Sequence, residues 1–143
     1  MAGRKRHAVV DAEGLPLAVQ VQSASVQDPI GAGPVLAEAK VRAPDLQLVW
    51  GDGRYQGPLV AQAAQAVGVR VEVVRKPPGT KGFTVLPRRW GIERTFAWLG
   101  KYRRVAGRDY ETNPRNSEAW IKICLSNLMR RRLAKRTICK PDD

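Results

Sequence analysis

The chain opens with short apolar runs separated by turn residues. Residues 7–11 and 15–23 predict two strands, because in the second run apolar residues recur with a period of two, at Leu17, Val19 and Val21. The segment Asp11–Gly14 has the composition of a tight turn. The pattern therefore predicts an antiparallel hairpin whose second strand has one wetter face.

A helix is expected after the hairpin. Asp28 and Pro29 predict its N-cap and its first residue, since aspartate accepts hydrogen bonds from free backbone N–H groups and proline needs no partner there. The helix is predicted to end near Val41, before Pro44. Its inward face is expected to carry Ile30, Val35, Leu36 and Ala39.

The middle of the chain alternates between strand and helix patterns. Residues 46–50 and 69–74 predict two further strands. Between them, residues 58–66 predict a helix that Gly68 ends. Residues 76–84 are rich in proline and glycine and predict a loop.

From Leu86 onward the spacing of apolar residues becomes helical. One face carries Ile92, Phe96 and Leu99, and another carries Arg89, Glu93, Lys101 and Arg104. The pattern breaks over residues 107–116. A last helix is predicted over residues 117–135, with an apolar stripe of Trp120, Ile123, Cys124, Leu128 and Leu133.

The order of these elements predicts the fold class. Two strands followed by alternating helices and strands, and then by two helices, favour an α/β fold with a mixed sheet covered by helices. A chain of 143 residues forms one domain or part of one. We place that domain at residues 1–136 and a tail at residues 137–143.

Positive charge is concentrated in the second half of the chain. Residues 1–80 hold 9 Lys and Arg against 7 Asp and Glu, whereas residues 81–140 hold 16 against 4. A one-sided basic excess favours a polyanionic partner, because phosphate contacts release counterions. The charge therefore favours a nucleic acid partner, the alternative being a basic surface that only aids solubility.

Membrane and metal-thiolate functions find no support in the sequence. It contains no apolar run of the length that a membrane span requires. Residues 1–7 lack the apolar stretch of a signal peptide, so we expect a cytoplasmic protein without a membrane partner. Cys124 and Cys139 have no histidine nearby and are expected to be reduced thiols rather than zinc ligands.

Two carboxylates are candidates for catalysis. Asp52 follows the strand predicted at residues 46–50, and ligands and metals collect at the carboxyl ends of strands in open α/β sheets. A turn-capping aspartate would occupy the same position. Glu93 lies among cations, where an ion pair with Arg89 is the simpler explanation. Together, two carboxylates in a cationic groove have the chemistry that two-metal phosphoryl transfer requires.

Four segments carry a resemblance to a known family: Gly3–His7, Trp50–Tyr55, Leu86–Leu99 and Ser117–Trp120. The second is similar to an Asp-x-Gly-Tyr block, and the third contains an Arg-x-x-x-Glu core at Arg89 and Glu93. Together they resemble the catalytic domain of bacterial insertion-sequence transposases, in the branch of the DDE superfamily named for insertion sequence five. The resemblance extends from Gly3 to about Ala134.

This resemblance implies a fold, an activity and a set of site residues. The fold would be a ribonuclease-H-like mixed sheet with flanking helices, and the activity metal-dependent cutting and joining of DNA at the ends of a mobile element. Asp52 and Glu93 would be catalytic and would ligate a divalent metal, expected to be Mg²⁺. The cations expected to bind DNA are Arg89, Arg94, Lys101, Arg103 and Arg104. Such a protein is expected in the bacterial cytoplasm, with the nucleoid.

The chain departs from the family pattern in two places. Arg54 stands where the aspartate block has glycine, so backbone strain is expected there. The strand with the family's first catalytic aspartate would precede Gly3–His7, and we expect it to be absent from this chain. Its absence would leave two unpaired sheet edges and an inactive chain. Neither Asp11, in the hairpin turn, nor Asp28, a helix cap, is expected to substitute.

Three functions remain open from the sequence. The first is a transposase fragment, either a second reading frame completed by frameshifting or a decayed copy, whose partners besides DNA would be a second copy of itself or an upstream reading-frame product. The second is a catalytically inactive DNA-binding remnant or regulator of its element, whose salt-dependent binding Asp52→Asn and Glu93→Gln would leave unchanged. The third is a ribonuclease-H-like nuclease acting on RNA, which a comparison of substrates would identify.

Overall fold

The computed structural model describes residues 3–82, 84, 86–107 and 109–138. The predicted hairpin is confirmed: β1 (Arg4–Val10) pairs antiparallel with β2 (Pro16–Ser23). At the turn, Oδ1 of Asp11 accepts the backbone N–H groups of Glu13 and Leu15. The aspartate thereby replaces backbone partners that the turn lacks, which is why the chain reverses there.

Helix α1 (Asp28–Arg42) follows as predicted, but it begins differently. The N-cap is Gln27, and it makes no side-chain capping bond, so the prediction that Asp28 caps the helix is wrong. Asp28 is the first helical residue, and its Oδ1 lies 3.1 Å from Nζ of Lys5 in β1. The inward face is confirmed at Val35, Leu36 and Ala39, which are buried, but Ile30 is 55% exposed and was predicted wrongly.

The strand–helix–strand unit is also confirmed. It consists of β3 (Leu48–Gly51), α2 (Pro58–Val67) and β4 (Arg70–Val73), with β3 and β4 parallel. Gly68 ends α2 in the left-handed conformation, at a φ of 69°, which glycine adopts without strain. The strain predicted at Arg54 is absent, since no described residue other than glycine has a positive φ.

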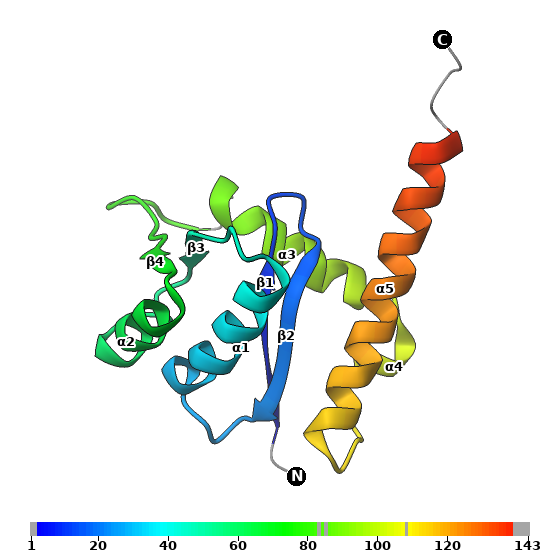
Figure 1. Cartoon of the computed structure of the whole chain (residues 1–143), viewed down its shortest axis with the longest axis horizontal. Coiled ribbons are helices and arrows are strands. Elements are labelled where there is room, and N and C mark those ends of the chain that lie inside the picture. Colours follow the sequence, from blue (N-terminus) through cyan, green and yellow to red (C-terminus); the bar gives the residue numbers. More distant parts are fainter. Residues whose placement is uncertain (1–2, 83, 85, 108, 139–143) are drawn as a thin grey trace.

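The sheet is divided in two, as expected for a mixed sheet that lacks a strand between the hairpin and the parallel pair. Within the described residues, β1 and β2 form one two-stranded sheet, and β3 and β4 form another. Figure 1 shows the two pairs side by side, with α1 in front of the hairpin and α2 beside β4. The mixed α/β class is therefore correct, and in the described part of the chain β1 and β3 do not pair with each other.

Three helices complete the described chain: α3 (Pro87–Leu99), α4 (Arg103–Ala106) and α5 (Pro114–Ile138). The sequence pattern did not predict α4, and it began α5 three residues late. It also chose the wrong stripe on α5. Ile123 and Leu133 are 58% and 65% exposed, whereas Ile121 and Leu125 are 1% and 2% exposed and form the packed face with Cys124.

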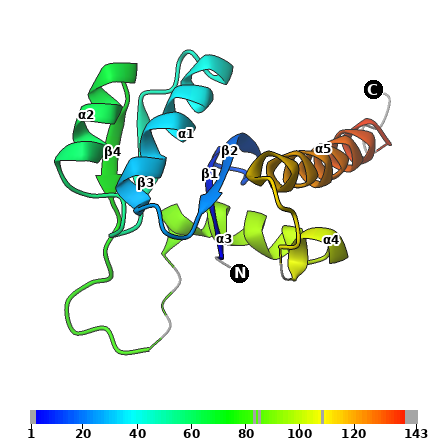
Figure 2. The same ribbon diagram turned by 90° about the horizontal axis from the view of Figure 1, so that it is seen from below.

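The hairpin has a hydrophobic cluster on each face. Alternate residues of β2 point to opposite faces. Ala18 packs with α1 and α2, whereas Val19 and Val21 pack with the end of α3, with α4 and with the first half of α5. Figure 2 shows α3 running beneath the β1–β2 hairpin. The face that was predicted to be wetter is covered by α1. Its polar residues have partners, since Gln20 bonds Glu38 and Gln22 bonds His7.

None of the helices in the described ranges is long and apolar enough to cross a membrane. Cys124 is a buried free thiol, as predicted, and burial raises its pKa. Cys139 lies outside the described residues.

Candidate active site

A groove of about 1050 Å³ separates the two strand pairs. One wall is β1, the opposite wall is β3 with the residues just before it, and the first half of α3 closes a third side. The groove therefore lies where the two small sheets fail to meet. Both predicted catalytic carboxylates, Asp52 and Glu93, line it.

Asp52 enters the groove from the loop directly after β3. Its Oδ1 accepts the backbone N–H of Arg54 at 2.9 Å, and its carbonyl oxygen accepts the N–H of Tyr55 at 3.0 Å. One carboxylate oxygen of Asp52 therefore makes the turn-capping hydrogen bond that the alternative explanation predicted. The second oxygen has no hydrogen bond within the described residues, so it is available to a ligand.

Glu93 reaches the groove from the second turn of α3. Its Oε1 lies 3.6 Å from Nη2 of Arg89, and the two side chains are 35% and 30% exposed. The ion pair predicted from their spacing is therefore present, at a distance too long for a strong hydrogen bond. Arg89 also lines the groove, so it adds positive charge beside the carboxylate.

A cation–π contact brings α3 towards β3. The guanidinium carbon of Arg88 lies 5.2 Å from the ring centroid of Trp50, which precedes Asp52 by two residues. This contact joins the start of the helix that carries Glu93 to the end of the strand that leads to Asp52. It explains why two residues 41 positions apart in the sequence line one groove.

Glycines allow α3 to lie close to the hairpin. A Cβ at Gly14, where φ is 78°, would come 2.9 Å from the carbonyl oxygen of Gly91, so only glycine fits there. Thr95, which is 1% exposed, donates its hydroxyl to the carbonyl oxygen of Gly14. These contacts fix the position of α3, and therefore of Glu93, relative to the hairpin.

Sequence reasoning missed a buried polar cluster beside Asp52. His7 of β1 is 2% exposed, and its Nδ1 lies 2.6 Å from the hydroxyl of Tyr55. Its Nε2 lies 2.5 Å from Nε2 of Gln22, so Gln22 donates to this nitrogen and His7 donates from Nδ1 to Tyr55. A Cβ at Gly31 would come 2.6 Å from Nε2 of His7, so glycine makes room for the ring.

The pKa values in this cluster follow from its burial. Burial lowers the pKa of His7, against the opposing effect of Asp28, and keeps the ring neutral. Burial, together with the carboxylates of Asp28 and Asp52, raises the pKa of Tyr55 to about 12. The hydrogen bond between His7 and Tyr55 ties the loop of Asp52 to the other sheet. The tyrosine lay in a recognisable block, but nothing in the sequence paired it with His7.

The remaining predicted DNA-binding cations lie outside the groove. Arg94 donates to the carbonyl oxygen of Glu13. Arg104 pairs with Glu111 at 2.6 Å and lies over the ring of Trp120. Lys101 and Arg103 are exposed beyond the end of α3. Of the five cations, only Arg89 is brought to the two carboxylates.

The described residues contain no group of three or more acidic, histidine or cysteine side chains arranged to hold a metal ion. The donors present are nevertheless of the right type, since hard divalent cations bind carboxylate oxygens. Asp52 has an uncommitted oxygen, and Glu93 is held only by a long ion pair. Both fit a divalent metal as part of a larger ligand set.

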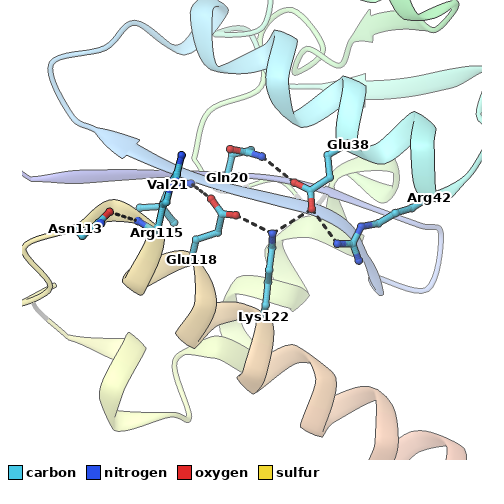
Figure 3. Close-up of polar contacts among 8 residues, drawn as sticks. All are labelled: Gln20, Val21, Glu38, Arg42, Asn113, Arg115, Glu118 and Lys122. Atoms are coloured by element: carbon cyan, nitrogen blue, oxygen red, sulfur yellow. Dashed lines mark hydrogen bonds and ion pairs between the residues drawn. The ribbon is translucent and has the colours of Figure 1, made fainter.

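The two outer edges of the hairpin differ. Figure 3 shows Glu118 of α5 beside β2, where its Oε2 accepts the backbone N–H of Val21 at 3.3 Å. Val21 stands opposite Arg6, and because its N–H points out to Glu118, the two form a non-hydrogen-bonded pair whose backbone groups turn away from each other. Ala8, two residues further along β1, has the same orientation. The outward groups of Arg6 and Ala8 face the groove. The β2 edge is thus capped, whereas the β1 edge opens onto the carboxylates.

The described chain is thus a mixed α/β fold with a basic second half and a groove that both carboxylates and cations line. In comparison with known families, residues 1–129 match the Transposase DDE domain. A protein of Burkholderia cepacia, whose name describes a transposase for insertion sequence element IS402, is 31% identical over 140 residues, which cover 90% of this chain. The chain belongs to the DDE transposase family. It spans 65% of that relative's length, and no solved structure matches it.

Proposed function

We propose that this chain is the carboxyl-terminal part of the catalytic domain of an insertion-sequence transposase, in the branch named for insertion sequence five. It binds the DNA of element ends and, in a complete domain, cuts and joins DNA by divalent-metal phosphoryl transfer. The observation that carries the proposal is that Asp52 and Glu93, on segments distant in sequence, line one groove.

Each groove residue has a chemical role in this proposal. Asp52 and Glu93 ligate a divalent cation, Mg²⁺ by the chemistry of its preferred ligands. Such a metal, when bound, activates the attacking oxygen and stabilises the leaving oxygen of a phosphodiester. Arg89 holds Glu93 by their ion pair and offers positive charge to the DNA backbone. The hydrogen bond from His7 to Tyr55 keeps the loop of Asp52 in place.

The proposed fold is ribonuclease-H-like, with one more strand between β1 and β3. Unpaired strand edges are a liability in folded proteins, yet both of these edges line the same groove. A strand inserted there would join the two sheets and would bring a third carboxylate beside Asp52 and Glu93. We propose that a segment preceding residue 1, in the same polypeptide or a second one, supplies it, and that the domain ends near residue 136. The protein would work with the nucleoid in the cytoplasm.

The decisive experiment is strand cleavage with and without the preceding segment. The segment encoded immediately upstream, in either frame, is fused to the chain, and nicking of duplex DNA is measured with Mg²⁺. We expect the fusion to cleave and the chain alone to bind without cleaving. Metal-dependent cleavage by the chain alone would show that two carboxylates suffice and that the inserted strand is not required.

Variants of the fusion separate catalysis from binding. Asp52→Asn and Glu93→Gln are expected to abolish cleavage and to leave DNA affinity within about twofold. Asp45→Asn serves as the control, because Asp45 also lines the groove but lies in the turn before β3. Cleavage that survives both substitutions would refute the assignment.

The second candidate function is a catalytically inactive DNA-binding remnant or regulator. It is favoured by the lack of any group of three potential metal ligands in the described residues. The same experiment distinguishes it, because a remnant would bind DNA with a steep salt dependence whether or not the upstream segment is present, and would cleave in neither form.

A further inference from the structure

The distal half of α5 leaves the hydrophobic core. Cys124 and Leu125 are its last buried residues, and Leu128 packs only partly against the second cluster. Beyond Leu128, most of the described side chains up to Lys135 are exposed. Figure 1 shows this end of α5 projecting past the tip of the hairpin. A helix that extends past its core needs another reason for its sequence there.

The charge of this segment is unbalanced. Between Leu128 and Ile138 the sequence contains 5 Lys and Arg and no Asp or Glu. Arg130 bonds only the side-chain oxygen of its neighbour Asn127, at 3.2 Å. Neither it nor the cations that follow, Arg131, Arg132 and Lys135, form a salt bridge with a carboxylate of the described residues. Cations without counter-charges on one helix favour a polyanion.

The cations continue the packed face of the helix. Ile121, Leu125 and Leu128 pack on the sheet, and steps of four and three residues from Leu128 lead to Arg132 and Lys135. The side of α5 that is apolar over β2 is therefore cationic beyond it. Among the cations that this side carries beyond the cluster over β2, Arg132 contacts α3 and the hairpin turn, whereas Lys135 is exposed.

A cation–π stack holds this end of α5 against α3. The Trp98 ring lies 5.0 Å from the guanidinium carbon of Arg94 and 4.0 Å from that of Arg132. Both arginines also donate to the carbonyl oxygen of Glu13 in the hairpin turn. The projecting cations are thus presented from a fixed base, which lowers the entropic cost of binding.

We propose that the segment from Arg130 to Lys135 of α5 binds the phosphate backbone of duplex DNA, as a contact separate from the groove of Asp52 and Glu93. This inference rests on the proposed function, which makes DNA the polyanion. The contact is independent of base sequence, because its cations reach phosphates rather than base edges. It would hold DNA outside the catalytic groove.

The test compares two triple variants that remove the same amount of charge. One is Arg130→Gln, Arg131→Gln and Lys135→Gln. Its control is Arg70→Gln, Arg75→Gln and Lys76→Gln, which changes exposed cations of β4 and the loop after it. Affinity for a duplex is measured against salt concentration, and circular dichroism checks the fold. We expect only the first variant to lower the salt slope, by about 0.9 for each phosphate that is no longer neutralised.

Each outcome has a distinct meaning. Equal reductions of the slope in both variants would show that net charge alone matters and would overturn the proposal. An unchanged slope in the first variant would also overturn it, while DNA binding by the unaltered chain would leave the proposed function standing. Absence of DNA binding by the unaltered chain would refute both. Binding to anionic lipid vesicles in preference to DNA would assign the segment to a membrane surface instead.

Discussion

The two edges of the β1–β2 hairpin differ in whether other parts of the chain cover their backbone groups. Along β2, α5 covers the edge, and the carboxylate of Glu118 satisfies the N–H of Val21. Along β1, the outward backbone groups at Arg6 and Ala8 open onto a groove of about 1050 Å³. Within the residues that the structure describes, the chain therefore blocks one edge with a charged side chain and leaves the other without a backbone partner.

The difference indicates what the open edge is for. Protein chains protect edge strands with charges and covering helices, and α5 with Glu118 does so along β2. The unprotected edge is the one that faces a second unprotected edge, on β3, beside two candidate catalytic carboxylates. In the proposed function, one added strand would pair with this edge and complete the site.

Hydrogen exchange tests this comparison directly, with the largest expected effect. In β1, the amides of His7 and Val9 face β2, whereas those of Arg6 and Ala8 face the groove. The first pair should be protected up to the global free energy of unfolding, about 5–15 kcal/mol for a natural domain, and the second pair hardly at all. The measurement is amide exchange followed by NMR. Val21 should be protected, although it too faces away from its partner strand.

Equal protection at even and odd positions of β1 would contradict the open edge. Protection of Arg6 and Ala8 that appears only when the upstream segment is fused to the chain would sharpen the comparison, because it would locate the added strand next to β1.

The covered edge depends on the packing of α5. Ile121 is 1% exposed in the cluster that joins α5 to β2, so Ile121→Ala should lower the free energy of unfolding by about 2–5 kcal/mol. Urea unfolding followed by circular dichroism measures it. The matched control is Ile123→Ala, two residues on and 58% exposed, which should change stability by less than about 0.5 kcal/mol. A larger loss of stability for Ile123→Ala than for Ile121→Ala would show that the stripe predicted from the sequence is the buried one.

The incorrect stripe shows where sequence patterns stop being informative. Helix α5 carries apolar residues on several sides, so Ile121 with Leu125 and Ile123 with Leu133 are both acceptable helical stripes. Only the position of the hairpin decides which stripe is buried. The existence of the helix followed from its own residues, but its rotation depended on a partner about a hundred positions earlier.

The groove was predictable only in part, for the same reason. Asp52 and Glu93 were identified through local motifs, and the structure places both in one groove. The bond between His7 and Tyr55 joins residues that carry no shared local signal. Asp28 was expected to cap its helix, but Lys5 on β1 offers it a stronger electrostatic partner. Local sequence motifs identify candidate site residues, whereas long-range contacts determine which role each residue takes.

The smallest effect concerns the ion network that links α5 to α1 across β2 (Figure 3). Lys122 lies 3.1 Å from Oε1 of Glu38 and 2.7 Å from Oε1 of Glu118. Burial acts to raise the pKa of Glu38, but hydrogen bonds from Lys122 and Gln20 outweigh it and hold that pKa below its ordinary value of 4.5. A carboxyl group with a depressed pKa stabilises the fold above its unfolded pKa and loses that contribution as pH falls through the folded value.

Glu38→Gln should therefore lower the free energy of unfolding by roughly 1 kcal/mol at neutral pH, with the deficit vanishing as pH falls below about 4.5. Denaturation at a series of pH values measures it. The control is Glu72→Gln, in the ion pair where the Arg70 and Glu72 side chains are 72% and 43% exposed, so solvent screening should keep the loss below about 0.5 kcal/mol. If the deficit of Glu38→Gln were the same at pH 3 and pH 7, the glutamate would act through packing rather than through charge, and the covered edge would owe its stability to Ile121 and its apolar neighbours.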